Sequence, residues 1–189
     1  MNSLCVKSVT RFLLILTILF LVAPNAAHAQ LNSNTGVVLV SATLLESLTV
    51  TVSPASVALN LAPGGVSAAS SPIAITTKWI LGANRSQVNV YGSFSSPASA
   101  LTDGLGDNIP SANILGLVTT GLPVTATPFS QSNPFGGSAS LKLVNQGIIT
   151  TNLANTRTDN LVLSIDMSTG PILPPGSYQG TLTIQAQAL

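Results

Sequence analysis

The sequence has almost no residues suited to acid–base, nucleophilic or thiolate chemistry. Its 189 residues include one cysteine, Cys5, and one histidine, His28, and both lie near the N-terminus. The rest of the chain therefore cannot form a Ser-His-Asp or Cys-His arrangement, and none of its side chains has an ordinary pKa near neutrality. It also cannot form disulfides or thiolate metal sites. We expect no catalytic residues and a protein that is not an enzyme.

Charged and aromatic residues are scarce as well, at 6% and 4% of the chain. From residue 30 onward the charges are Lys78, Arg85, Lys142 and Arg157 against Glu46, Asp103, Asp107, Asp159 and Asp166, so four minus five gives a net charge of −1. Four scattered cations cannot neutralise a run of phosphates, and we expect no nucleic-acid partner. A polar surface with a net charge near zero favours association, which suggests a protein that assembles.

The first 29 residues have the pattern of an export signal. Lys7 and Arg11 precede an apolar run at residues 12–22, and Ala27 and Ala29 occupy the small-residue positions of a cleavage site before Gln30. The apolar run has 11 residues, whereas a membrane-spanning helix needs about 20. We therefore predict a signal helix in the precursor, residues 1–29, and an exported periplasmic, cell-surface or extracellular product with no membrane span. Residues 30–189 suffice for a single domain.

Alternation of apolar and polar residues with period two predicts strands over most of residues 30–189. The clearest segments are residues 37–52, 57–61, 73–81, 87–95, 114–118, 141–149, 160–168 and 178–189. No segment carries a helical stripe of three turns, so the predicted fold is all-β, with short strands at the spacing of an antiparallel β-sandwich. We expect residues 73–81 and 87–95 to pair as a hairpin, residues 150–160 to form a polar turn, and Glu46 to mark a bulge or bend.

The parity of the alternation also predicts the core. The apolar side chains expected to face one another between two sheets are Trp79, Phe94, Leu163, Ile165, Leu182 and Ile184. Trp79 is the only tryptophan, and we interpret it as a core anchor; the alternative is an exposed platform for a ligand.

The C-terminal segment Leu173-Pro-Pro-Gly-Ser-Tyr-Gln-Gly-Thr-Leu-Thr-Ile184 combines a proline-glycine turn, a tyrosine and an alternating strand. It resembles the same region of bacterial exported immunoglobulin-like domains, including spore coat U-like and other chaperone-usher pilin-type subunits. The resemblance implies an immunoglobulin-like antiparallel β-sandwich and a structural subunit that assembles with itself or with other envelope proteins. The chain differs from a common pilin pattern because it has no cysteine pair and has its own alternating terminal strand.

One cluster has the chemistry of a metal site. Asp103, Asp107 and Asn108 supply hard oxygen ligands in a glycine-containing loop, and Ca²⁺ prefers such ligands. Their spacing is not that of an EF-hand, and Asp-Gly and Asp-Asn are also ordinary turn dipeptides. Calcium binding and a plain turn therefore both remain open, and no other cofactor is expected. Ser140 and Lys142 share a strand face, but we interpret Lys142 as a solvated side chain and not as a catalytic base.

Two functions follow from these observations. The first is an exported, non-enzymatic structural or surface protein, such as a pilus or coat subunit. The second is an extracellular module that binds carbohydrate or another neutral ligand with the loop at residues 96–113 and with Tyr91 or an exposed Trp79. Residues 37–52 bear on the first function, because an exposed alternating strand is a template for pairing with another chain. We expect this strand to pair within its own domain, since sequential elements usually pack locally.

Overall fold

A computed structural model describes residues 33–136 and 139–189. The predicted signal peptide and its helix lie outside these residues. The chain divides into two units, residues 1–42 and 43–189. Within the first unit, residues 33–42 form no regular secondary structure and have exposed side chains. The second unit contains every described strand.

The described strands are β1 (Ser47–Ser53), β2 (Val66–Ala68), β3 (Ile73–Ile80), β4 (Gln87–Phe94), β5 (Leu101–Thr102), β6 (Asn108–Ile109), β7 (Ile114–Val118), β8 (Thr127–Pro128), β9 (Gln131–Ser132), β10 (Ala139–Gly147), β11 (Ala154–Asp166) and β12 (Leu182–Ala188). A 3₁₀ turn, η1 (Ser111–Asn113), is the only helical element in the described part of the chain. The all-β prediction is therefore confirmed.

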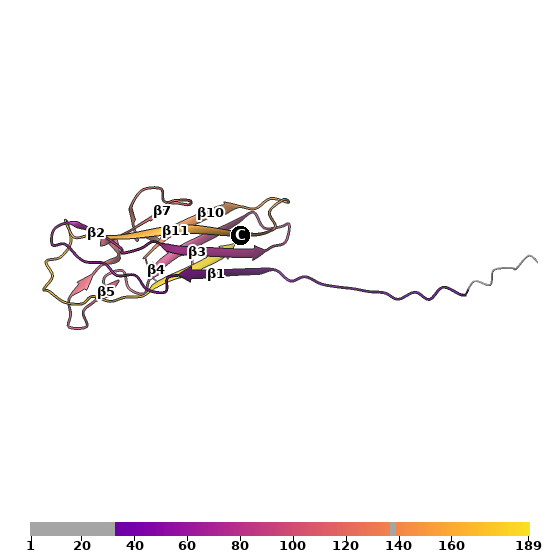
Figure 1. The fold of residues 1–189 in the computed structure, drawn as a ribbon, viewed down its shortest axis with the longest axis horizontal. Coiled ribbons are helices and arrows are strands. Elements are labelled where there is room, and N and C mark those ends of the chain that lie inside the picture. The colour runs from indigo at the N-terminus through magenta and orange to yellow at the C-terminus, as the bar shows by residue number, and fades with distance from the viewer. Residues whose placement is uncertain (1–32, 137–138) are drawn as a thin grey trace, which may run out of the picture. The chain divides into compact units, whose positions relative to one another are not determined.

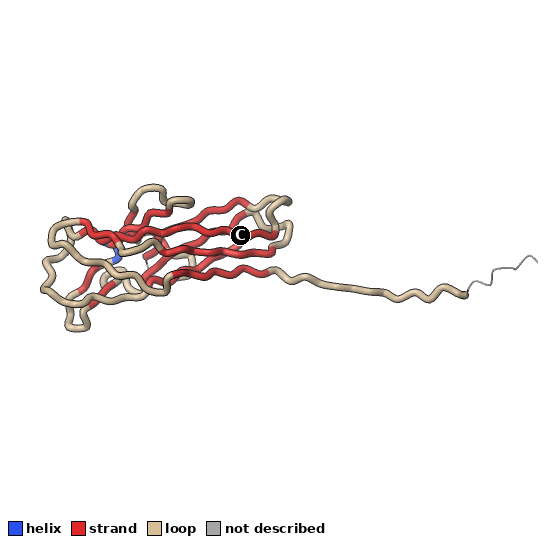
Figure 2. The backbone as a smooth tube through the Cα atoms, in the orientation of Figure 1, coloured by secondary structure: helices blue, strands red, loops and turns tan. Residues whose placement is uncertain are grey.

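The strands form two main antiparallel sheets (Figures 1 and 2). One sheet has the order β1-β3-β11-β7-β8, with β2 also pairing with β11. The other has the order β12-β4-β10-β9, and β5 and β6 form a small separate pair. Every described pairing is antiparallel, and the two sheets pack face to face as a β-sandwich because their inward side chains form one shared core.

The core consists of two clusters along the sandwich. The larger cluster joins Phe94, Leu163 and Ile165 with buried residues of both sheets, and Leu182 and Ile184 pack against it while remaining partly exposed. Trp79 belongs to the smaller cluster with Leu81, Val88 and Ile148, and its Nε1–H donates to the Asn152 carbonyl at 2.8 Å. Each predicted core residue thus belongs to a core cluster or packs against one. Trp79, the only tryptophan of the sequence, is 1% exposed and is a core anchor.

The predicted hairpin of residues 73–81 and 87–95 is wrong, although both strands exist. β3 pairs with β1 and β11, whereas β4 pairs with β10 and β12, so residues 82–86 cross from one sheet to the other. Leu81 and Val88 on either side of this connection lie in the same small core cluster. Facing strands of opposite sheets bury both of these apolar side chains, and sequence periodicity cannot distinguish this arrangement from a hairpin.

Two further predictions need correction. Residues 150–160 were expected to be a polar turn, but β11 begins at Ala154. Its first half lacks apolar alternation because polar side chains there bond to one another. Arg157 and Asp159 form an ion pair, and Thr158 Oγ1 forms a 2.9 Å hydrogen bond with Thr76 Oγ1 on β3. The expected strand at residues 57–61 is reduced to one isolated bridge between Leu59 and Ala69.

Truncation of the core on β11 is expected to be costly. Leu163→Ala or Ile165→Ala should lower the free energy of unfolding by about 2 to 5 kcal/mol, because each removes buried methyl groups and leaves a cavity. Chemical denaturation followed by Trp79 fluorescence measures this change. Ile172→Ala is the matched control, since Ile172 is fully exposed and should change stability by less than about 0.5 kcal/mol. A comparable loss in the control would contradict the assigned core.

Candidate functional site

The two sheets have edge strands, β1 and β12, on the same side of the sandwich. β1 is hydrogen-bonded only to β3, and β12 only to β4, among the strands that the structure describes. β12, the yellow strand in Figure 1, lies close to β1 without pairing with it. This side of the sandwich is therefore an open edge, with unpaired backbone groups on both strands.

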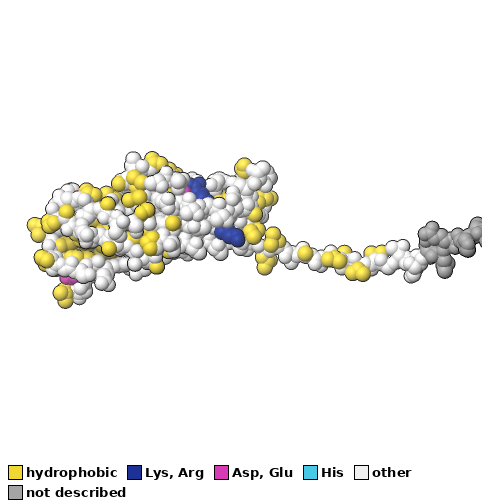
Figure 3. All heavy atoms as spheres, in the orientation of Figure 1, with side chains coloured by type: hydrophobic (Ala, Val, Ile, Leu, Met, Phe, Trp, Pro, Cys, Tyr) yellow, Lys and Arg dark blue, Asp and Glu magenta, His cyan; other side chains and the backbone are white. Residues whose placement is uncertain are grey.

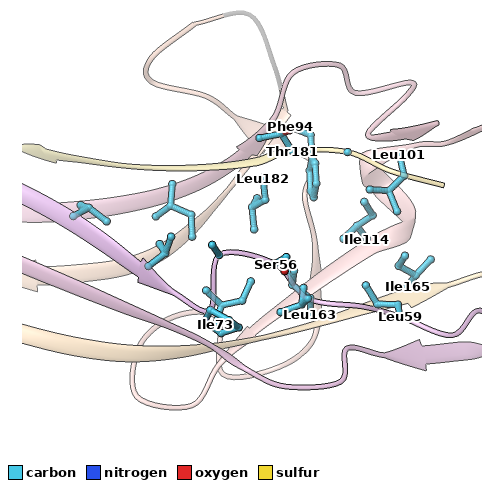
Figure 4. Close-up of a pocket in the computed structure, with 17 residues that line it drawn as sticks. Ser56, Leu59, Ile73, Phe94, Leu101, Ile114, Leu163, Ile165, Thr181 and Leu182 are labelled. Atoms are coloured by element: carbon cyan, nitrogen blue, oxygen red, sulfur yellow. The ribbon is translucent and has the colours of Figure 1, made fainter. Parts of the chain in front are cut away.

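A hollow of about 370 Å³ opens along this edge. Its lining includes Phe94 and Leu182 from one sheet and Ile73 and Leu163 from the other, and Figure 4 shows these side chains directed into the space between the sheets. Most of the other lining side chains, from β1, β7, β11 and β12 and the chain after β1, are also apolar. The open edge thus gives access to the main core, and apolar side chains are the groups that it can accommodate.

The same edge is closed at the end where β1 begins. Leu48 of β1 and Ala188 of β12 both pack against the small cluster around Trp79. The carboxylate of Glu46, directly before β1, accepts hydrogen bonds from the backbone N–H of Gly82 at 2.5 Å and from Nη2 of Arg85 at 2.8 Å. Glu46 therefore lies directly before β1, and the bulge or bend expected between two pieces of a strand is not observed, because residues 37–46 form no strand on its N-terminal side.

These contacts hold the pKa of Glu46 near 2, mainly through the Arg85 hydrogen bond and then through the Gly82 N–H. A carboxyl group with a lowered pKa in the folded state stabilises folding above its ordinary pKa of about 4.5, and this stabilisation is lost as the pH falls towards 2. The carboxylate consequently remains charged through mildly acidic conditions.

The opposite side of the sandwich is closed by a charged network. Arg157 of β11 donates from Nε to Asp159 Oδ2 at 2.7 Å and from Nη2 to Oδ1 at 2.8 Å. Its Nη1 donates to Gln146 Oε1 on β10 at 2.9 Å, and Nη2 also donates to the Thr120 carbonyl. Asp159, 1% exposed, also accepts from Thr120 Oγ1 at 2.6 Å. The hydrogen bond to Asp159 raises the pKa of Arg157, so this link between the sheets remains charged.

A second hollow, of about 1040 Å³, lies among the loops at the other end of the sandwich. It shares Leu59, Leu101 and Gly180 with the first hollow, so the two lie next to each other. Tyr178 lines it and donates its O–H to the Pro174 carbonyl at 2.9 Å. Desolvation, followed by the negative charges of Asp107 and Asp103, raises the pKa of this tyrosine.

The segment before β1 carries large apolar side chains in solvent. Val37, Val38, Leu39 and Val40 are between 83% and 93% exposed, and these hydrophobic side chains are visible along the segment in Figure 3. Leu44 and Leu45, the first apolar pair ahead of Glu46, are each 81% exposed. The predicted strand over residues 37–52 is therefore confirmed only from Ser47 onward, and residues 37–46 pair with none of the described strands.

The candidate calcium residues Asp103, Asp107 and Asn108 lie in and beside the turn between β5 and β6. One oxygen of Asp103, Oδ1, accepts three backbone N–H groups within this turn, from residues 105, 106 and 107. Asn108 Nδ2 donates to the Gly106 carbonyl. The described residues contain no group of three or more acidic, histidine or cysteine side chains arranged to hold a metal ion. Calcium binding here stays a prediction, and the observed hydrogen bonds are those of a turn.

The aromatic residues considered for ligand binding are mostly covered. Tyr91 is 9% exposed, packs edge-to-face against Phe135 at 5.9 Å and has Lys142 Nζ 5.5 Å above its ring. Ser140 is fully buried and donates to the Ser132 carbonyl at 2.9 Å. Trp79 and Tyr91 therefore provide no open stacking platform for a sugar ring.

Sequence reasoning missed the open edge and the Arg157–Asp159 link. The spacing of the two charged residues, two apart in a strand, places both on one face and could have indicated the link. The open edge had no local sequence signal, because it depends on which strands lie next to each other.

None of the described helical elements is long and apolar enough to cross a membrane. Comparisons of the chain with models of known protein families, with curated proteins and with solved structures found no match.

Proposed function

We propose that the protein is an exported, non-enzymatic structural subunit that assembles with copies of itself. In each contact, the apolar segment before β1 of one copy adds a strand alongside β12 of the next copy. The observation that carries this proposal is the open edge of β12 above an apolar hollow. Export and the absence of catalysis rest on the sequence.

The strand order supports the idea of a missing neighbour. In an immunoglobulin sandwich, a seventh strand pairs with the free edge of the sixth. Here β1, β3, β11 and β7 have the order of the four-stranded immunoglobulin sheet, and β12, which pairs with β4, has the place of the sixth strand. The Tyr178–Pro174 hydrogen bond before β12 matches the tyrosine corner at the start of that strand. The free edge of β12 is thus where a seventh strand would pair.

The segment before β1 has the pattern that such a strand requires. Its even positions, Val38, Val40, Ala42 and Leu44, are all apolar, whereas Ser41 and Thr43 interrupt the odd face. Burial of one valine or leucine side chain contributes about 1.5 to 3 kcal/mol, so the three large side chains of the even face supply about 4 to 9 kcal/mol before the costs of association. Residues 36–45 are also long enough to span the seven residues of β12.

Docking into another copy is favoured over folding back within one chain. The segment meets β1 at the closed end of the edge, so it would have to reverse direction tightly to enter its own hollow. Leu44, Leu45 and Glu46 include none of the glycine, proline, asparagine or aspartate residues that favour tight turns. A contact of this kind uses a different surface on each copy and produces an open chain of subunits instead of a closed dimer. The resemblance of residues 173–184 to exported immunoglobulin-like subunits agrees with this function.

Peptide binding tests the proposed acceptor edge. A labelled peptide of residues 34–46 should bind a chain whose own segment is blocked by Val38→Lys and Val40→Lys. Adding Ile184→Asp, which places a charge in the hollow, should weaken binding tenfold or more, whereas Thr183→Asp on the exposed face of β12 should not. Fluorescence anisotropy measures both affinities. Equal binding by the two variants, or no binding at all, would overturn the proposal.

A further inference from the structure

The junction between the apolar segment and β1 is held by an ion pair. Glu46 contacts Arg85 through Nη2 at 2.8 Å and Nε at 3.3 Å, and it accepts the Gly82 N–H at 2.5 Å. Leu45, on one side of Glu46, is 81% exposed, whereas Leu48 on the other side packs into the core. The pair therefore lies at the boundary between apolar residues in solvent and the first strand of the sandwich.

Arg85 also connects this junction to the other edge strand. Its Nη1 donates to the Ala188 carbonyl at the end of β12, at 3.4 Å. The neighbouring Ser86 N–H donates to the Leu189 carbonyl at 2.5 Å. The start of β1, the connection between β3 and β4, and the end of β12 are thus joined at one end of the open edge.

The local backbone is shaped around the Glu46 carboxylate. A Cβ atom added at Gly82 would lie 2.7 Å from Asn84 Oδ1 and 3.0 Å from Glu46 Oε1, so a larger residue would displace the carboxylate or the turn. From residue 30 onward, the chain has only nine Asp, Glu, Lys or Arg residues, and two of them meet here.

We propose that the Glu46–Arg85 pair is a latch that keeps β1 in its own domain while the preceding segment is donated to another copy. This inference rests on the proposed function. Among the described strands, β1 pairs only with β3, and the apolar pattern continues from the segment into β1. Without a fixed boundary, β1 could leave with the segment, and the result would be an exchange of the whole strand.

Loss of β1 would also expose the small core cluster. Leu48 is the cross-strand partner of Trp79 and packs against its cluster, and Trp79 is 1% exposed with Leu48 in place. The latch therefore divides the chain between residues that are donated, up to Leu45, and residues that are retained, from Ser47 onward. It contacts no residue of the hollow, so its role is to position the junction and not to bind the donated strand.

A disulfide trap distinguishes donation of the segment from exchange of β1. Thr49 and Lys78 are cross-strand partners of β1 and β3 with exposed side chains, and the chain from Gln30 onward has no native cysteine. Thr49→Cys and Lys78→Cys are introduced together, the protein is assembled from the chain beginning at Gln30, and the thiols are then oxidised. Non-reducing denaturing electrophoresis shows whether the disulfide lies within one chain or between chains.

With the latch intact, we expect the disulfide to lie within single chains. Adding Glu46→Ala or Arg85→Ala should increase the disulfides between chains at least fivefold. Arg85→Lys should give an intermediate value, because lysine retains the positive charge but lacks the several N–H donors of the guanidinium group. Lys142→Ala, which removes a cation away from the junction, should have no effect. Trp79 fluorescence checks that each variant folds. We expect that all of them do, because the side chains of Arg85 and Glu46 are 36% and 41% exposed and their loss leaves no cavity in the core.

The outcomes separate the latch from the function on which it rests. If the intact chain assembles and the latch variants trap no more disulfides between chains than Lys142→Ala, the latch proposal is overturned and the proposed function stands. If the intact chain does not assemble, both are overturned. If disulfides between chains already dominate with the latch intact, β1 is exchanged together with the segment and the latch proposal is wrong.

Discussion

A chain carrying Val38→Lys and Val40→Lys is expected to remain a folded monomer at concentrations at which the unmodified chain forms large assemblies. Both side chains are more than 80% exposed, so the substitutions remove no contact that stabilises the domain. They place two charges on the face of the segment that would enter the apolar hollow, where an unpaired charge is strongly unfavourable. Light scattering after size-exclusion chromatography, with the chain beginning at Gln30, measures the change.

The matched control changes the other face of the same segment. Ser41→Lys and Thr43→Lys add the same charge at the two polar positions of the odd face, which would point away from the hollow, so assembly should persist. Deletion of residues 30–45 should have the same effect as the Val38 and Val40 substitutions and leave a folded monomer. Assembly that survives in the Val38 and Val40 variant, or that is lost equally in both variants, would contradict the donation of this face. Loss of folding on deletion would instead support completion of the chain's own sheet.

Asp159→Ala is expected to lower the free energy of unfolding by about 3 to 5 kcal/mol, because it leaves Arg157 without its partner between the sheets. The carboxylate is 1% exposed and accepts two hydrogen bonds from Arg157 and one from Thr120. Removing it leaves Arg157 Nε and Thr120 Oγ1 without the acceptor that they share, although Arg157 keeps its bonds to Gln146 and to the Thr120 carbonyl. Chemical denaturation followed by Trp79 fluorescence measures the loss.

Asp166→Ala on the same strand is the control for this substitution. Among the described residues, its carboxylate accepts hydrogen bonds from Ser168 alone, two residues away, and its loss should change stability by less than about 1 kcal/mol. Replacing both partners, with Arg157→Met and Asp159→Leu, should restore part of the stability lost in Asp159→Ala, because no charge is then left unpaired. A double variant less stable than the single variant would show that the network contributes more than its desolvation cost.

The sequence by itself determined the fold class and most strand positions. Alternation predicted residues 73–81 and 87–95 to within one residue of β3 and β4, because a strand with one buried face must place an apolar side chain at every second position. The same reasoning placed Trp79, Phe94 and Ile165 inside. The absence of histidine and cysteine after residue 29 likewise follows from composition and needs no structure.

Partner choice was decided only by the tertiary structure. Alternation identifies a buried face but not the neighbouring strand, and this explains why residues 73–81 and 87–95 were assigned to a hairpin when they lie in different sheets. It also explains why residues 37–46 could not be separated from β1: their pattern is the same, and only the sheet shows that β3 provides partners from Ser47 onward and none before it.

The candidate site depends on this missing information. An open edge exists because β12 has a neighbour on one side and none on the other among the described strands, a property of the whole sheet that no local segment encodes. Charged contacts such as Glu46–Arg85 join residues 39 positions apart, and their pairing depends on the fold that brings β1 next to the connection between β3 and β4. Short-range periodicity fixes which side chains are buried, whereas long-range packing fixes which edges remain unpaired.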